Sequence, residues 1–261
     1  MKISNNTKIN IDNSLIEKLK NAKHLVILTG AGISAESGIP TFREDDKTGL
    51  WDNYAAKELC TKRDFSRNPK LVWGWYEWRR HTVLCAKPNA GHEIIVKLVD
   101  ALPKVTLMTQ NVDDLHERAG SQNVLRFHGN IHKARCFHCF HSYQHPQTTK
   151  FLKQPIEIEP PKCEKCGDWI RPGVVFFGES PTRSAVRDAE QAVNECDLMF
   201  IIGTSGIVAP VNKLPKSAIE RNITTVQINL TETNLDTEVT FDLKGKAGVI
   251  LPELYKMAFE E

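Results

Sequence analysis

The sequence predicts an α/β protein that is built on a doubly wound parallel sheet and carries a second, smaller domain. Short apolar runs alternate with helical segments along most of the chain, as such a sheet requires. The first run, at residues 25–28, leads directly into a glycine-rich turn. A stretch rich in Cys, His, Pro and Lys at residues 136–171 interrupts the alternation and indicates a separate module.

The pattern of apolar residues places the main elements along the chain. An amphipathic helix is expected at residues 14–20, with Ser14 as its N-cap, and a second from residue 88 to 102, opened by Asn89-Ala90-Gly91-His92. Residues 44–87 show few strand signals and carry apolar and aromatic residues at helical spacing, so we expect helical excursions from the sheet there. Strands are expected at residues 25–28, 105–109, 124–127, 198–202 and 225–228.

Gly30, Gly32 and Ala35 follow the first predicted strand with the G-x-G-x-x-A spacing of a dinucleotide-binding turn. Small residues let the backbone approach a pyrophosphate, and the N–H groups of a following helix favour its negative charge. A long polar loop then follows where an ordinary dinucleotide fold would continue into its helix. The turn therefore indicates a Rossmann-like nucleotide site with an unusual loop.

Polar or glycine residues follow each of the predicted strands at once. In an open α/β sheet, ligands bind beyond the carboxyl ends of the strands. These strand tips therefore predict one binding site at one edge of the sheet, independently of any family resemblance. The tips are Gly30-Ala31-Gly32, Gln110-Asn111-Val112-Asp113, His128-Gly129, Gly203-Thr204-Ser205 and Asn229.

Four of the seven cysteines form two C-x-x-C pairs, Cys136 with Cys139 and Cys163 with Cys166. Four thiolates suit tetrahedral Zn2+ and close its coordination shell, so the pattern predicts a structural zinc ribbon. Four thiols without a metal are the alternative. Nearby histidines that could substitute as ligands are His138, His141 and His145.

The chain therefore divides into two predicted domains. The large, Rossmann-like domain is expected at residues 14–43, 88–130 and 173–261. The small domain is expected to combine a helical module at residues 44–87 with the zinc-binding module at residues 131–172. The remaining cysteines are expected to be small buried hydrophobic residues; they are Cys60, Cys85 and Cys196.

Charge and hydropathy argue against several classes of partner. The chain has 34 basic and 32 acidic residues, a net charge of +2, so no basic field indicates nucleic acid. No apolar run approaches the ~18–20 residues of a membrane span. The N-terminus shows neither the apolar core of a secretion signal nor an arginine-rich amphipathic pattern. We therefore expect a cytoplasmic monomer with no nucleic-acid or membrane partner.

Each strand tip also has a purely structural explanation. Asn111 or Asp113 could cap a helix, and residues 173–179 could form a core strand. His128 could be a structural histidine at the end of a strand. Its titration near neutrality and its place on the same sheet edge as the glycine turn also make it a candidate for acid–base chemistry.

The stretch GAGISAESGIPTFR, at residues 30–43, resembles the NAD-binding signature of the sirtuins, the NAD-dependent protein-lysine deacylases. The stretches Gln110 to Asp113 and His128-Gly129 are similar to sirtuin motifs and stand in the same order, so the resemblance covers residues 25–254. It implies that His128 is the general base and that Asn111 takes part in catalysis beside the nicotinamide. It implies NAD contacts at Gly30, Ala31, Gly32, Ser34, Phe42, Arg43, Gln110, Asn111, Asp113, Gly203, Thr204, Ser205, Asn229 and Ala247. It implies that a substrate peptide adds as a strand beside Val174, Phe176, Phe177, Gly178 and Glu179.

Tyr76 and Arg79 stand at i and i+3 on one face of a predicted helix. An arginine binds a carboxylate bidentately, and a phenol adds a hydrogen bond. This Tyr-x-x-Arg pattern resembles the sirtuin subclass that removes malonyl and succinyl groups. An aromatic helix face with two solvated arginines is the alternative. Cys60 departs from the subclass, which usually carries an alanine there that widens the acyl pocket.

The resemblance implies that NAD is consumed as a co-substrate. The acyl-lysine carbonyl oxygen attacks the nicotinamide ribose, nicotinamide leaves, and His128 draws a proton through the ribose hydroxyls. The implied partners are acyl-lysine proteins or peptides, and the products are free lysine, nicotinamide and O-acyl-ADP-ribose.

Other activities stay open at this point. A deacetylase without acidic-acyl preference belongs to the same family, and a mono-ADP-ribosyltransferase shares the first bond cleavage. A nicotinamide-dependent oxidoreductase fits the glycine turn, but no acidic residue ends a clear second strand ~20 residues further on. A zinc-ribbon nucleic-acid binder fits the cysteines but not the balanced charge.

Overall fold

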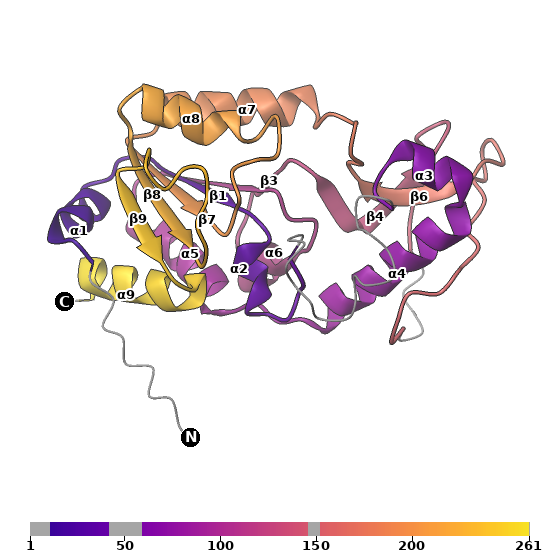
Figure 1. Ribbon diagram of the computed structural model, residues 1–261, viewed down its shortest axis with the longest axis horizontal. Helices are drawn as coiled ribbons and strands as arrows, with labels where there is room; N and C mark the ends of the chain where they lie inside the picture. Colours follow the sequence, from indigo (N-terminus) through magenta and orange to yellow (C-terminus); the bar gives the residue numbers. More distant parts are fainter. Residues whose placement is uncertain (1–10, 42–58, 146–151, 261) are drawn as a thin grey trace, which may run out of the picture.

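The computed structural model describes residues 11–41, 59–145 and 152–260, so Phe42 and Arg43 lie outside the described residues. Its main feature is a six-stranded parallel sheet with the strand order β3-β2-β1-β7-β8-β9 (Figure 1). The predicted doubly wound parallel sheet is therefore confirmed. The strands are β1 (Leu25–Thr29), β2 (Val105–Thr109), β3 (Leu125–Arg126), β7 (Leu198–Ile202), β8 (Thr224–Asn229) and β9 (Phe241–Lys244).

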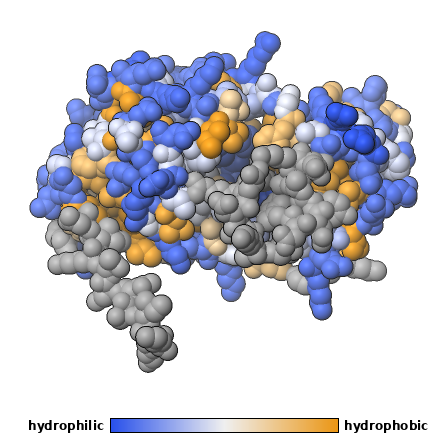
Figure 2. Space-filling model, in the orientation of Figure 1, coloured by the Kyte–Doolittle hydropathy of each residue, from blue (hydrophilic) through white to orange (hydrophobic). Residues whose placement is uncertain are grey.

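Strand β1 is buried on both faces of the sheet, which explains its continuous apolar sequence. Leu25 and Ile27 contribute to one hydrophobic core, and Val26 and Leu28 contribute to another, because successive side chains of a strand point to opposite faces. Hydrophilic side chains predominate over the outer surface of the two helices at the top of the view (Figure 2), as expected for helices that bury one face only. The face with Leu25 and Ile27 is covered by α1 (Asn13–Lys20), α5 (Ala90–Ala101) and α9 (Ala247–Phe259). The face with Val26 and Leu28 is covered by α7 (Arg183–Glu195) and α8 (Lys213–Glu220).

Strand β9 is absent from the predicted strands. In the part of the chain that the structure describes, it pairs with β8 alone and forms the edge of the sheet. Leu243 is the one buried residue of its four. Asp242 and Lys244 form an ion pair at 2.9 Å. An edge strand with alternate charged residues has no continuous apolar run, so the pattern that reveals the buried strands does not reveal this one.

The sequence predicts the N-terminal residues of α5 correctly and the N-cap of α1 wrongly. The prediction that Ser14 caps α1 is wrong: Asp12 is the N-cap, and its Oδ1 accepts a hydrogen bond from the Ser14 N–H at 2.8 Å. The predicted entry into α5 is confirmed. The Asn89 side chain accepts from the Gly91 N–H at 2.9 Å, and His92 Nδ1 accepts from the Asn89 N–H at 3.3 Å.

The second part of the molecule combines helices with a small antiparallel sheet of strand order β5-β4-β6 (Figure 1). This arrangement agrees with a small domain of helical and cysteine-rich modules, although the boundaries given above stay a prediction. Within the described ranges, no helix has both the length and the apolar character needed to cross a membrane. The elements here are α3 (Lys62–Arg67), α4 (Pro69–Cys85), β4 (Gly129–Cys136), β5 (Ser142–Tyr143) and β6 (Ile170–Val174).

Helix α4 confirms the helical character predicted for the second half of residues 44–87, and its aromatic residues build a core. Trp75 and Trp78 pack with Phe65 and Phe176. Of the three cysteines expected to be buried, Cys60 and Cys196 are buried, but the expectation is wrong for Cys85, because it is the exposed last residue of α4.

Gly74 lies in the middle of α4 because another segment crosses the helix there. A Cβ at this position would lie 1.8 Å from the carbonyl oxygen of Ile156, closer than any real contact. Backbone atoms of a packed segment cannot move aside as the end of a side chain can. The glycine therefore serves close packing between α4 and the segment around Ile156.

We predict that Gly74→Ala destabilises the protein by about 1–3 kcal/mol, because the added methyl group overpacks the contact with Ile156. Urea unfolding would measure this change. The sign of the effect is diagnostic, since an unstrained Gly→Ala change inside a helix stabilises by about 1 kcal/mol. A more stable variant would therefore contradict the close contact.

Candidate active site

The glycine turn after β1 lies against the turn after β7. The Gly30 N–H donates to the Ile202 carbonyl at 2.9 Å, and the Gly32 N–H donates to the Gly203 carbonyl at 2.8 Å. A Cβ on Gly30 would lie 2.6 Å from the Gly203 oxygen. The chain adds strands on one side of β1 first and then returns to its other side with β7. The turn therefore occupies the topological switch point, where open α/β sheets bind their ligands.

A short helix, α2 (Gly32–Ala35), follows the turn and places Ser34 beside two other polar side chains. Asn111 Nδ2 donates to Ser34 Oγ at 3.1 Å, and Ser34 Oγ donates to Asp113 Oδ2 at 3.0 Å. All three residues are buried. Burial raises the pKa of Asp113, while hydrogen bonds from the Leu115 N–H and Ser34 act in the opposite direction. The structure thus brings these predicted site residues together.

Helix capping explains only part of the segment between residues 110 and 113. Asp113 Oδ1 accepts from the Leu115 N–H at 3.1 Å at the start of α6 (Leu115–Ala119). Asn111 makes no such contact with the helix; its side chain is directed to Ser34. The structural explanation therefore holds for one oxygen of Asp113 and fails for Asn111.

Polar side chains from three strand tips meet around Thr204. Gln110 Nε2 donates to Thr204 Oγ1 at 2.7 Å, and Asn229 Nδ2 donates to the Thr204 carbonyl at 2.9 Å. Gly203 and Ser205 flank Thr204 in the same turn. Ala247 opens α9, where the Gly248 N–H donates to Glu36 at 2.7 Å. The residues expected around the ribose and adenosine therefore share this edge of the sheet.

His128 stands between β3 and β4, with its ring tied to the neighbouring strand tip. Its Nδ1 lies 2.9 Å from the Gln110 carbonyl oxygen. A carbonyl only accepts, so Nδ1 carries the proton and the neutral ring presents Nε2 as its basic nitrogen. Burial lowers the pKa of His128, and the Gln110 carbonyl acts in the opposite direction. This geometry suits a general base.

Tyr76 and Arg79 are buried side chains of α4, with Arg79 only 7% exposed. The Tyr76 hydroxyl donates to Cys60 Sγ at 3.3 Å, and the Arg79 guanidinium lies over the ring of Trp75 at 5.0 Å. Arg80 is buried as well and pairs with Glu77. A face with two solvated arginines is therefore excluded.

Arg79 lies near the end of the site that holds Asp113. Burial lowers the pKa of the Arg79 guanidinium, while the negative charges that Tyr76, Cys60 and Asp113 can carry act in the opposite direction. Val112 and Leu115, on either side of Asp113, pack in the same hydrophobic cluster as Trp75 and Tyr76 of α4. The helix α4 and the strand tip after β2 therefore adjoin one another.

The segment after β6 carries the residues expected to bind a peptide. The Phe177 N–H donates to the Cys60 carbonyl at 2.7 Å, and Thr61 and Phe177 form a parallel bridge. Phe176 is buried, whereas Phe177 is 49% exposed and Gly178 has a φ of 84°. Val174 ends β6, so it is a core strand residue as well as the start of this segment.

Glu179 holds the segment after β6 in place through hydrogen bonds to Arg171 and Phe176. Its Oε1 accepts from Arg171 Nη1 at 2.7 Å, and its Oε2 accepts from Arg171 Nη2 at 3.0 Å and from the Phe176 N–H at 2.8 Å. Arg171 is buried and lies over the Phe176 ring at 3.7 Å. These contacts give Glu179 a structural task, and its contact with substrate stays a prediction.

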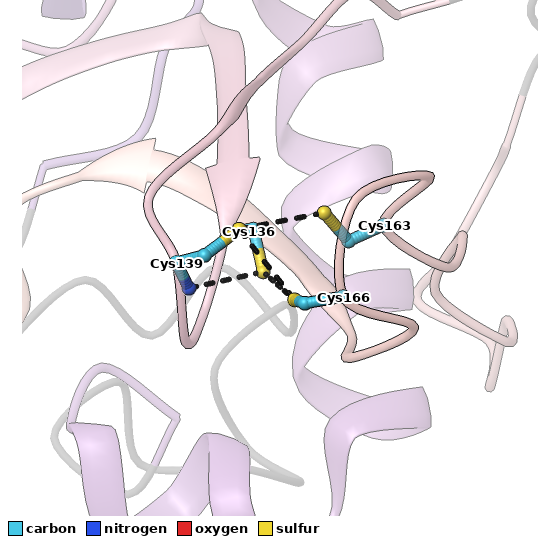
Figure 3. Close-up of side chains that lie close together, drawn as sticks. All are labelled: Cys136, Cys139, Cys163 and Cys166. Carbon is cyan, nitrogen blue, oxygen red and sulfur yellow. Dashed lines mark hydrogen bonds between the residues drawn. The ribbon is translucent and has the colours of Figure 1, made fainter.

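The four predicted metal ligands meet in one cluster (Figure 3). The ligand sulfur atoms of Cys136, Cys139, Cys163 and Cys166 all lie within 4.8 Å of one another, with three separations of 3.4 to 3.6 Å. Zn–S bonds of about 2.3 Å in a tetrahedron place sulfur atoms about 3.8 Å apart, so the cluster fits Zn2+. Four protein ligands leave no open position, which is the arrangement of a structural site.

The nearby histidines do not belong to this cluster. In the described part of the chain, the group of possible metal ligands contains the four cysteines alone. His145 instead lies 3.3 Å from Glu77 and stacks on Trp73 of α4. It therefore packs the cysteine-rich module against the helix.

Sequence reasoning missed several residues that support the site. Arg126 donates to the Asn111 carbonyl at 3.1 Å and to the Asp113 carbonyl at 2.7 Å. Thr29, Thr109 and His116 form hydrogen bonds behind Asn111. The threonines end the apolar runs of β1 and β2, and a buried polar residue at the end of such a run is the signal that could have revealed them.

A glycine turn at the switch point, polar strand tips on the same edge and a four-cysteine module together define a dinucleotide-binding α/β protein with a structural metal site. Residues 30–210 match the family model described as the Sir2 family. The chain belongs to this family, the sirtuins.

Relatives that are named for an activity align with most of this chain. The NAD-dependent protein deacylase of Methylococcus capsulatus is 48% identical over 241 residues, which cover 92% of this chain and 94% of that protein. NAD-dependent protein deacylase 1 of Pseudomonas aeruginosa is 46% identical over 248 residues, 94% of this chain and 98% of that protein. A solved complex of a Sir2 homolog with NAD matches with a TM-score of 0.85 at 40% identity, covering 97% of this chain and 95% of that chain. The protein is thus an enzyme of the NAD-dependent protein deacylase class.

We predict that removal of Zn2+ from the four-cysteine cluster lowers the melting temperature by on the order of 10 °C, since metal binding contributes directly to the folding energy of such modules. Calorimetry before and after chelation, with the metal content measured, would show this. The exposed cysteine variant Cys85→Ser should bind metal as the wild type does. An unchanged melting profile of metal-free protein would contradict a structural role.

Proposed function

We propose that this enzyme removes succinyl and malonyl groups, and acetyl groups less efficiently, from lysines of proteins or peptides. One acyl-lysine, one NAD and one water give free lysine, nicotinamide and O-acyl-ADP-ribose. Similarity to proteins named NAD-dependent protein deacylases supports the type of reaction. A solved Sir2 complex with a p53 peptide and NAD+, which matches with a TM-score of 0.77 at 28% identity over 95% of this chain and 98% of that chain, supports a peptide substrate.

The observation that carries the acidic-acyl preference is the buried guanidinium of Arg79. It stands one helical turn from Tyr76 on α4, and Asp113 is among the groups that influence its pKa. A carboxylate at the end of an acyl group would form a charge-assisted pair with Arg79. It would also accept from the Tyr76 hydroxyl, in place of Cys60 Sγ. An acetyl group ends in a methyl group where a succinyl or malonyl group carries its carboxylate, and a methyl group makes neither contact.

The NAD molecule would lie along the edge formed by the strand tips. The turn at Gly30, Ala31 and Gly32 suits the phosphates, because its small residues let them approach the backbone closely, and Ser34 stands beside it. The turn at Gly203, Thr204 and Ser205 suits the adenosine, together with Asn229 and Ala247. Gln110 suits the nicotinamide ribose, and Asn111 and Asp113 suit the nicotinamide. Phe42 and Arg43 keep the roles expected from their motif as proposals, since they lie outside the described residues.

His128 would act as the general base at the ribose of NAD. The Gln110 carbonyl holds its Nδ1–H, so Nε2 is the nitrogen that receives the proton. The peptide would add as a strand beside the segment from Val174 to Gly178. The hydrogen bond from the Phe177 N–H to the Cys60 carbonyl, at 2.7 Å, holds this segment in place. A cytoplasmic location, a monomeric state and the absence of nucleic-acid partners stay predictions.

Matched peptides that differ only in the acyl group would test the proposal. The enzyme is incubated with NAD and a succinyl-, malonyl- or acetyl-lysine peptide, and the products are identified by mass spectrometry. Faster loss of succinyl or malonyl, with nicotinamide and the O-acyl-ADP-ribose appearing together, supports it. Loss of acetyl alone would indicate a deacetylase without acidic-acyl preference. Consumption of NAD with ADP-ribose transferred to protein would indicate a mono-ADP-ribosyltransferase.

We predict that Arg79→Gln lowers kcat/KM for the succinyl peptide by roughly 10- to 100-fold, because a hydrogen-bonded charge pair with the acyl carboxylate is lost. The value for the acetyl peptide should change much less. Arg80→Gln serves as the matched control, since Arg80 is buried in the same helix but pairs with Glu77. Equal losses for both peptides in Arg79→Gln would mean that Arg79 does not recognise the acyl carboxylate.

We predict that activity persists at pH values at which an ordinary histidine, with a pKa of about 6.5, is already protonated. Burial lowers the pKa of His128, and only the neutral ring is a base, so activity is lost as pH falls through this lower pKa. A profile of kcat/KM against pH would give the midpoint. A midpoint at or above the ordinary value, or retained turnover in a folded His128→Ala variant, would exclude His128 from this role.

A further inference from the structure

Three buried polar side chains lie directly behind Asn111, at the ends of β1 and β2 and at the start of α6. Thr29, Thr109 and His116 are each at most 1% exposed. Thr29 Oγ1 lies 2.8 Å from Thr109 Oγ1 and 2.9 Å from His116 Nε2. The Asn111 N–H donates to Thr109 Oγ1 at 3.0 Å. We call Thr29, Thr109 and His116 the buried polar chain.

The Thr29 hydroxyl stands at the centre of these hydrogen bonds. It donates to Thr109 Oγ1 at 2.8 Å, with the Met108 carbonyl at 3.4 Å as a second acceptor, and it shares a hydrogen bond with His116 Nε2 at 2.9 Å. Burial lowers the pKa of His116 well below its ordinary value, so the ring is neutral. Thr109 Oγ1 therefore accepts from Thr29 on one side and from Asn111 on the other.

Asn111 is held on both sides of its backbone and at its side chain. Thr109 accepts from its N–H, and Arg126 donates to its carbonyl at 3.1 Å. Asn111 Nδ2 donates to Ser34 Oγ at 3.1 Å. The amide of Asn111 cannot change direction without breaking one of these contacts.

The buried polar chain also leads back to the glycine turn. The ring of His92 packs edge-on against His116, with ring centroids 4.9 Å apart. His92 Nδ1 accepts from the Asn89 N–H, and Asn89 Nδ2 donates to the Ile33 carbonyl at 2.8 Å. Ile33 precedes Ser34, the partner of Asn111. The contacts that start at His116 therefore reach Ile33 of α2, and the side chain of Asn111 reaches Ser34 of the same helix.

Packing alone does not explain polar groups at these places. Among the described residues, His92 Nε2 and His116 Nδ1 are buried and have no hydrogen-bond partner, which costs stability. Valine has nearly the shape of threonine and is favoured in strands that are buried on both faces. The hydroxyls of Thr29 and Thr109 instead connect a histidine to the backbone of Asn111.

We propose that Thr29, Thr109 and His116 are positioning residues that orient Asn111 toward the nicotinamide end of NAD. This inference rests on the role of Asn111 in the proposed function. The hydrogen bond between His116 Nε2 and Thr29 Oγ1 holds the Thr29 hydroxyl, which donates to Thr109 Oγ1. Thr109 then fixes the backbone N–H of Asn111, so that the amide side chain meets its ligand without rearrangement.

The test compares Thr109→Val with Thr109→Ser, because serine keeps the oxygen that accepts from Asn111 and valine removes it. The measured quantities are kcat/KM for NAD, KM for the acyl peptide and the inhibition constant of nicotinamide. In Thr109→Val we expect a roughly fivefold to tenfold loss in kcat/KM for NAD and a similar weakening of nicotinamide inhibition. In Thr109→Ser both values should return to those of the wild type, and the peptide KM should change in neither.

Thr106→Val is the matched control on the same strand. Thr106 Oγ1 lies 2.9 Å from His24 Nε2 at the opposite end of β2, so this variant also removes a hydrogen bond between a threonine and a histidine. It should lose stability and keep wild-type values for NAD and nicotinamide. If Thr109→Val does not fold, the pair Thr29→Val and Thr29→Ser gives the same comparison one step further from Asn111.

The proposal is overturned if Thr109→Val keeps wild-type values, if Thr106→Val changes them equally, or if serine does not restore them. Asn111→Ala separates this failure from that of the proposed function. Unchanged nicotinamide inhibition in Asn111→Ala would remove Asn111 itself from the nicotinamide site. Weakened inhibition in Asn111→Ala together with wild-type inhibition in Thr109→Val would leave the proposed function in place and remove the positioning role.

Discussion

The close approach between the turns after β1 and β7 is the constraint on which the rest of the site depends. Gly30 and Gly32 lie so near Gly203 that neither could carry a side chain without displacing backbone atoms. Two backbone hydrogen bonds join these turns. Because the turn is fixed in this way, α2 starts at one defined place and Ser34 reaches both Asn111 and Asp113. The strand tips can then act together, since their separations are set by the ladder of the parallel sheet.

Burial determines the chemistry that each side chain can perform. His128 is kept neutral by its surroundings while the Gln110 carbonyl decides which nitrogen is basic. Asp113 and Arg79 are both buried, at the place where α4 packs against the strand tip after β2. Burial strengthens every electrostatic interaction that these two side chains can make. The ion pair of Arg171 and Glu179 separately holds the segment that follows β6, which is proposed to bind the peptide.

The sequence predicted those features that depend on residue type over a short stretch. Buried strands such as β1 appear as apolar runs, and the two C-x-x-C pairs predict the four-cysteine cluster. Other features were missed for local reasons. Asp12 takes the cap expected of Ser14, β9 has no apolar run, and Cys85 is exposed at the last residue of α4. The contacts of Thr109 and Arg126 with Asn111 could not be predicted, because they join segments whose neighbourhood only the fold defines.

A single strand connects the reaction centre with the cysteine cluster. Strand β4 starts at Gly129, directly after His128, and ends at Cys136, the first cysteine of the cluster. Eight residues of strand span about 26 Å, far too long for a metal ion at one end to polarise groups at the other. The pairing of β4 with β6 is also irregular between Gly129 and Ala134. The cluster can therefore act on the end of the strand at His128 only through the backbone and packing of β4, and not through the charge of a bound ion.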